Sequence, residues 1–120
     1  MAEGIAKKYL NNFSIESAGV KPKEIHSLAI KVMQEISIDI SKHYSKSITD
    51  EEIKFFDIII TLCGDAKDQC VNINSLADIH LHWDIEDPAK FRGSQLNKLI
   101  IFRKVRDQIE NKIKELKNTL

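Results

Sequence analysis

Apolar and polar residues alternate along this chain with two periods, and the longer period predicts the main helices. Apolar side chains recur every three or four residues, the spacing that places them on one helix face. The strongest such pattern follows Pro22. Proline is favoured at the first position of a helix, so this helix is predicted to begin there. Its apolar positions are Ile25, Leu28, Ala29, Val32, Met33 and Ile36. Helices are therefore predicted over residues 2–11, 22–36 and 49–55, and from Gln95 through Leu120.

The shorter period and the β-branched runs predict strands. The stretch DIIITLC, residues 57–63, is almost continuously apolar, as in a strand that a parallel sheet covers on both faces. ADIHLHW, residues 77–83, predicts a second strand, and FSIESAGV, residues 13–20, predicts a short strand with a turn. A short helix over 66–70 and a polar loop over 84–94 complete the pattern. Strands that alternate with helices predict an α/β fold with a parallel sheet.

Composition places the chain among ordinary globular domains. At 120 residues and 13.8 kDa, residues 1–120 are expected to form one domain. The formal net charge is zero, which argues against nucleic-acid and membrane-surface partners. No apolar run approaches the ~18 residues that span a membrane, and the first ten residues lack an apolar signal core. We therefore expect a cytoplasmic protein, whose cysteines face a reducing environment.

Both cysteines of the chain, Cys63 and Cys70, lie in the segment TLCGDAKDQC. They follow the carboxyl end of a predicted strand, where open α/β sheets bind ligands. In a continuous helix, seven steps of ~1.5 Å would separate their Cα atoms by ~10.5 Å. A disulfide needs less than ~7 Å, so the pair joins only if the backbone between them unwinds, which Gly64 facilitates. The spacing leaves three interpretations open: two inert buried thiols, a transient redox pair, or metal ligands.

Histidines and acids near the second predicted strand offer further chemistry. His80 and His82 share one strand face, but their spacing from the cysteines matches no usual zinc site, and packed or capped histidines are the simpler interpretation. Asp87 precedes Pro88, a pair typical of a turn. Asp87 is also a candidate general acid, since it lies in a loop that follows a predicted strand.

Six segments in order resemble thioredoxin-coupled arsenate reductases of the low-molecular-weight protein tyrosine phosphatase superfamily, and together they span nearly all of the chain. The segments are MAEGIAKKY, SIESAGV, AIKVMQEISIDISKHYSKSI, DIIITLCGDAKDQC, HWDIEDPAKF and FRKVRDQIENKI. The most specific motifs are SAG, IDIS.H.S, TLC with a second cysteine seven residues on, HW..EDP and FR.VRD.I. The resemblance implies a three-layer α/β fold with helices flanking the parallel sheet.

The resemblance also implies a relay of three thiols acting on arsenate. A cysteine in an N-terminal Cys-x5-Arg loop attacks arsenate, the residue matching Cys63 attacks that cysteine, and arsenite leaves. The residue matching Cys70 then attacks, and thioredoxin reduces the resulting Cys63–Cys70 disulfide. Asp87 matches the general acid of the family. No tightly bound cofactor and a monomeric full-length protein are implied.

A monovalent-cation site is also implied beneath the anion loop. Glu3 and Ser17 match two of its positions. Lys46 stands where some members carry an acid, which argues against potassium and suggests that the lysine supplies the positive charge itself.

In the family, MAEG directly follows the Cys-x5-Arg loop. The resemblance therefore implies that the first strand, central between 13–18 and 57–63, is missing with its loop from these residues. On this basis the 120 residues alone are expected to be an inactive fragment. Two alternatives stay open: a phosphatase of the same superfamily, and a catalytically dead module that binds a partner.

Overall fold

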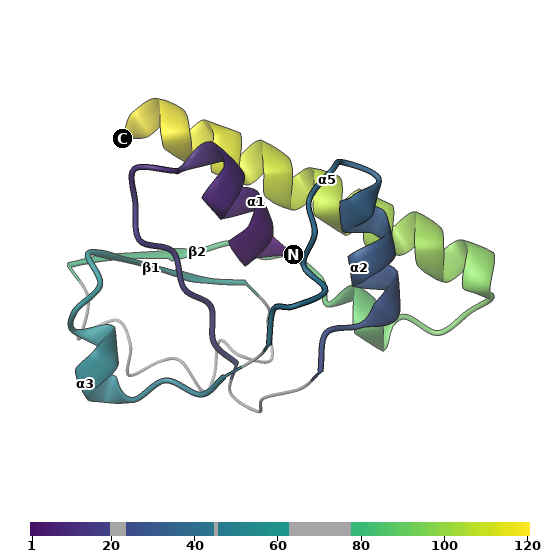
Figure 1. The fold of residues 1–120 in the computed structure, drawn as a ribbon, viewed down its shortest axis with the longest axis horizontal. Coiled ribbons are helices and arrows are strands. Elements are labelled where there is room, and N and C mark those ends of the chain that lie inside the picture. Colours follow the sequence, from purple (N-terminus) through teal and green to yellow (C-terminus); the bar gives the residue numbers. More distant parts are fainter. Residues whose placement is uncertain (20–23, 45, 63–77) are drawn as a thin grey trace.

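Two parallel strands and one long helix organise the fold. The computed structural model describes residues 1–19, 24–44, 46–62 and 78–120. In Figure 1, the long helix runs beside two shorter helices, and the strand pair lies below the long helix. The elements are α1 (Ala2–Tyr9), α2 (Ser27–Gln34), α3 (Asp50–Ile53), β1 (Ile58–Thr61), β2 (Ile79–His82), the 3-10 helix η2 (Pro88–Lys90) and α5 (Gln95–Thr119).

The parallel pairing of β1 with β2 confirms the α/β prediction. The register joins Ile58 to Ile79 at one end and Thr61 to His82 at the other. Both strands are shorter than the predicted spans of 57–63 and 77–83. Burial is also less complete than the apolar run suggested, because the first three residues of β1 are only half-buried and Ile79 is exposed.

The apolar core lies between α1, α2 and α5. Helix α5 packs against both shorter helices and contributes one buried residue every three or four positions. This spacing is the one that the sequence pattern predicted for the chain's last helix. The core residues shared by these helices and the segments between them are Ile5, Leu10, Ala29, Val32, Met33, Ile40, Ile85, Phe102, Val105, Ile109 and Ile113. No helix among the described residues is long and apolar enough to cross a membrane.

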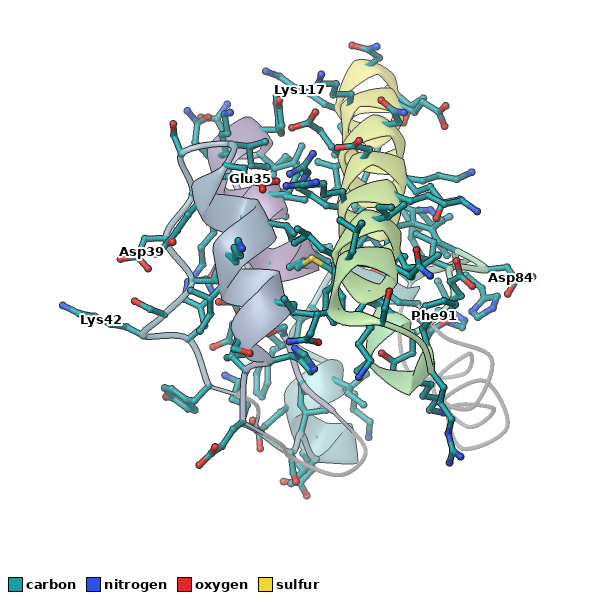
Figure 2. All side chains as sticks on the ribbon, turned by 90° about the vertical axis from the view of Figure 1, so that its right-hand side faces the viewer. Glu35, Asp39, Lys42, Asp84, Phe91 and Lys117 are labelled. Atoms are coloured by element: carbon teal, nitrogen blue, oxygen red, sulfur yellow. The ribbon has the colours of Figure 1, made fainter. Side chains whose placement is uncertain are left out.

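Charged groups bind α2 to α5 at the edge of this core. Arg103 and Arg106 of α5 place guanidinium nitrogens 2.7 and 2.8 Å from the carboxylate of Glu35, which follows α2. Arg106 also donates to the carbonyl oxygen of Val32 at 2.9 Å. The hydrogen bond from Arg103, with a smaller one from Arg106, lowers the pKa of Glu35 to about 2. In Figure 2, Glu35 points from the end of α2 toward α5. We call Glu35, Arg103 and Arg106 the Glu35 clamp.

Helix α2 is shorter than the predicted 22–36. His26 caps its start, since the Nδ1 atom accepts from the backbone N–H of Leu28 at 3.1 Å. The helix ends before Ser37, whose φ of 63° lies in the left-handed region that helices cannot continue through. The backbone N–H groups of Ile36 and Ile38 then return to the carbonyl of Met33, which closes the turn.

The strand predicted for 13–20 is wrong over residues 13–19, which form no strand in the structure. A strand exists only when a neighbour supplies ladder hydrogen bonds, and among the described residues β1 pairs only with β2. The segment is instead held by single bonds. Gly19 donates from its backbone to the carbonyl of Lys46 at 2.9 Å, and Ser17 donates to Glu3 at 2.6 Å.

The remaining predictions concern the two short helices and the turn-rich loop. Thr49 caps α3, the helix predicted over 49–55, because its hydroxyl accepts the backbone N–H of Glu52 at 3.2 Å. The helix predicted over 66–70 lies outside the described residues. The predicted polar loop 84–94 contains η2, because Asp87 and Pro88 begin a helical turn there.

Candidate active site

The carboxyl end of β1 leads into the segment that holds both predicted thiols. Cys63 and Cys70 both lie outside the described residues, so the predicted thiol pair is neither brought together nor separated. The chain just before Cys63 is described. Trp83 donates from its backbone to the carbonyl of Thr61 at 2.9 Å, and Ile85 to that of Leu62 at 3.1 Å. The backbone is therefore hydrogen-bonded up to Leu62, the residue immediately before Cys63 in the sequence.

The side chain of Thr61 makes contacts at this strand end that the sequence pattern did not predict. Its hydroxyl oxygen lies 2.6 Å from Nδ1 of His82 and 3.2 Å from Nε2 of His80. Thr61 is only 7% exposed. Its partners lie 19 and 21 residues further along the chain, so only the parallel register brings them together. The apolar run around Thr61 gave no signal that its hydroxyl was used.

The interpretation of His82 as a packed or capped histidine agrees with its partly buried position and its contact with the Thr61 hydroxyl. His80 and His82 share one face of β2, as predicted, and both rings reach the same hydroxyl. Among the residues that the structure describes, no group of three or more His, Cys, Asp or Glu side chains is placed to hold a metal ion. The histidine pair alone therefore defines no zinc site.

Asp87 occupies a capping position. Its Oδ1 atom accepts the backbone N–H of Ala89 at 3.0 Å, which fixes the first turn of η2. The turn interpretation of Asp87–Pro88 is confirmed. The second carboxylate oxygen, Oδ2, is not part of that bond, so capping does not prevent proton transfer. The role of general acid stays a prediction, because its partner thiols lie outside the described residues.

Glu3 and Ser17 meet at the predicted cation position. Ser17 donates to Glu3 at 2.6 Å, Lys7 lies 3.1 Å from the same carboxylate, and Nδ1 of His43 lies 3.3 Å from it. Burial acts to raise the pKa of Glu3, but the hydrogen bonds from Ser17 and Lys7 outweigh it, and the net shift is downward. The carboxylate of Glu3 is therefore held ionised among groups that already balance its charge.

An open cavity of about 320 Å³ adjoins this cluster, with Lys42 and Tyr44 among the residues that line it. Lys46 also lines it and lies 3.1 Å from Glu16, whose hydrogen bond raises the pKa of the lysine. Two ammonium groups beside the available oxygen ligands make this arrangement a poor fit for potassium. The expectation that lysine supplies the positive charge here stays a prediction.

The parallel strand pair and its helices form an α/β fold, as the resemblance to low-molecular-weight phosphatases and their relatives predicts. The family model "Low molecular weight phosphotyrosine protein phosphatase" matches residues 1–120. The chain belongs to this family.

Relatives with known names and a solved structure show which members of this family the chain is similar to. An arsenate reductase of Halalkalibacterium halodurans is 41% identical over 120 residues, which cover 99% of this chain and 86% of that protein. An arsenate reductase of Bacillus subtilis is 38% identical over 123 residues, with the same coverage. Among solved structures, an arsenate reductase in the phosphate-binding state matches with a TM-score of 0.77 at 28% identity, and covers 98% of this chain and 86% of that one.

The likeness to the predicted family is thereby confirmed at the level of family and fold. The finer expectation, that a first strand and a Cys-x5-Arg loop are missing, is not supported by these comparisons. They align 99% of this chain with 86% of its relatives, and neither figure establishes what precedes residue 1. That expectation stays a prediction.

Proposed function

We propose that this chain is the part of an arsenate reductase in which Cys63 and Cys70 are the thiols that supply two electrons. One observation carries the proposal. The chain is 41% identical to an arsenate reductase, and it places both of its cysteines seven residues apart directly after β1. Cytoplasmic location and a monomeric state remain expectations that accompany this proposal.

The proposed chemistry balances. A first thiolate attacks arsenic in arsenate, and water leaves as Asp87 protonates the departing oxygen. The Cys63 thiolate then attacks that first sulfur. The electrons of the arsenic–sulfur bond stay on arsenic, which leaves as arsenite. Cys70 attacks Cys63, which frees the first thiol and leaves the Cys63–Cys70 disulfide. A dithiol protein of the thioredoxin class takes up the oxidation by thiol–disulfide exchange.

This scheme needs three thiols, and the 120 residues contain two. The proposal therefore predicts that these residues alone do not turn over arsenate, and that a chain extended upstream by a Cys-x5-Arg segment does. The assay supplies arsenate, thioredoxin, thioredoxin reductase and NADPH, and follows NADPH oxidation. Turnover by the 120 residues alone would refute the three-thiol scheme.

The thiol pair itself is tested in the extended chain. Replacing Cys63 or Cys70 with serine should abolish turnover. A function that does not use these thiols would survive both substitutions. Mass spectrometry after one turnover without thioredoxin should find Cys63 linked to Cys70. Failure to find that link under turnover conditions would sink the assignment.

Phosphate-ester hydrolysis is the second candidate, because the matching family model describes phosphotyrosine phosphatases. The extended chain distinguishes the two functions. Phosphatase activity that survives replacement of both cysteines with serine, together with no arsenate turnover before replacement, would favour the phosphatase.

A further inference from the structure

The Thr61 hydroxyl joins two imidazole rings at the end of β1. Thr61 pairs with His82 in the strand register, and His80 lies two residues earlier on the same face of β2. The oxygen is 2.6 Å from Nδ1 of His82 and 3.2 Å from Nε2 of His80. Because Thr61 is nearly buried, little water competes for these bonds.

The two distances indicate the direction of both hydrogen bonds. A hydroxyl carries one proton and two lone pairs, so it donates to at most one of the two rings, and the roles depend on the histidine tautomers. Bonds donated by O–H are shorter than those donated by N–H. The 2.6 Å contact therefore fits Thr61 donating to His82, and the 3.2 Å contact fits His80 donating to Thr61. On this assignment His82 carries its ring proton on Nε2.

The backbone of the same residues is fixed as well. The carbonyl of Thr61 accepts from Trp83 at 2.9 Å, and the carbonyl of Leu62 accepts from Ile85 at 3.1 Å. Ile85 is buried in the core, 7% exposed. Side-chain and main-chain bonds therefore hold the last residues before Cys63 to a segment that packs into the core.

We propose that Thr61, held by His82, is a positioning residue for the thiol chemistry of Cys63. The inference rests on the proposed function and adds Thr61 and His82 to it. Thiol attack requires the reacting sulfur atoms to meet within a narrow range of distance and angle. Cys63 follows Leu62 directly in the chain, so the hydrogen-bonded strand end fixes the point from which the thiol segment begins. The proposal concerns only the step in which the Cys63 thiolate attacks, so it predicts a change in kcat and little change in the binding of arsenate.

The experiment uses the chain with its upstream segment and compares Thr61→Val with Thr61→Ser. Valine has nearly the shape of threonine without the hydroxyl, and serine keeps the hydroxyl. Thr61→Val should lower kcat for arsenate reduction about tenfold, below the ~100-fold that a 1 Å misplacement can cause. KM for arsenate should change by less than about twofold, and Thr61→Ser should recover most of kcat. Thr119→Val is the matched control, because it removes a hydroxyl that donates to Leu116 at the far end of α5.

The partner side of the bond gives a second pair of variants should Thr61→Val fail to fold. The amide oxygen of His82→Asn replaces the Nδ1 acceptor, whereas His82→Phe removes it. The first should keep kcat near that of the unsubstituted chain, and the second should lose about tenfold. Nitrogen-15 NMR of the histidine rings should find Nδ1 of His82 unprotonated, and Thr61→Val should change that signal.

Each result separates this inference from the proposed function. An unsubstituted chain with no arsenate turnover overturns the proposed function itself. A chain that turns over, but whose kcat is unchanged by Thr61→Val, overturns only the positioning role. Equal losses in Thr61→Val and Thr61→Ser, or in the two His82 variants, would show that the hydroxyl bond is not the cause. A protonated Nδ1 on His82 would also contradict the inference.

Discussion

Gly4 of α1 lies where the helix approaches the core most closely, and we predict that Gly4→Ala destabilises the protein. A Cβ at this position would stand 2.8 Å from Cγ2 of Ile40, 3.1 Å from Cγ2 of Ile38 and 3.3 Å from Cε of Met33. Ordinary contacts of this kind begin at 3.4 Å. The methionine end can swing aside, but the branched methyl of Ile40 is buried, 1% exposed, and has no space to move into.

Two opposing effects set the magnitude. Alanine in a helix interior is favoured over glycine by about 1 kcal/mol. Overpacking a filled core typically costs about 1–3 kcal/mol. Because the tightest contact is with the least mobile neighbour, we expect the overpacking cost to win. The free energy of unfolding should fall by about 1 kcal/mol, which corresponds to roughly 4 °C in Tm for a chain of this size.

Urea unfolding followed by circular dichroism measures this change. Gln108 provides the control, since it is exposed in α5, and comparing Gln108→Gly with Gln108→Ala isolates the helix preference. That difference should be about 1 kcal/mol in favour of alanine. If Gly4→Ala proved as stabilising as this control difference, α1 would not be confined by Ile40, and the reasoning from the close contact would be refuted.

Three further predictions follow from the described contacts. Glu35→Gln should destabilise the protein above pH 5 and lose that effect as pH falls toward 2. The reason is that a carboxyl whose pKa drops from 4.5 to about 2 on folding stabilises the protein only while it is ionised. A difference in urea midpoint between the two proteins that stays constant from pH 7 to pH 2 would contradict this. Asp87→Asn should keep the cap on Ala89, and hence the urea midpoint, but lower kcat for arsenate reduction by about 100-fold in the extended chain; unchanged kcat would exclude the general-acid role. Ser94→Ala should lower the free energy of unfolding by about 1 kcal/mol, since the Ser94 hydroxyl accepts the N–H of Asn97 at 3.1 Å. Ser94→Asp preserves the acceptor and should show little change in the same urea titration. Equal losses in both variants would argue against a capping role.

The sequence pattern predicts those parts of the fold that depend on local spacing. The apolar positions of α5 repeat over 25 residues, so the period is unambiguous, and Phe102, Val105 and Ile109 are buried as expected. The β-branched run that becomes β1 indicates a strand before any partner is known. Ends of elements are less predictable, since α2 ends at Gln34, shortly before Ser37 takes a left-handed conformation that the apolar spacing does not indicate.

Features that depend on distant neighbours could not be predicted in this way. The alternation in 13–20 suits a strand, but no ladder partner lies beside it among the described residues. The Thr61 bond needs the register of β1 against β2, which no local pattern contains. Cysteine spacing indicated the candidate thiols from the sequence alone, whereas their geometry stays a prediction because both lie outside the described residues.

The Glu35 clamp has a consequence for how relatives of this protein are recognised. The motif FR.VRD.I supplies both of its arginines, and the remaining apolar positions of that motif are buried against α1 and α2. The motif therefore indicates that α5 packs against α1 and α2, and it contains no residue of the proposed thiol relay. On the proposed function, the paired cysteines after β1 would therefore be a better marker of arsenate reduction than this helical signature.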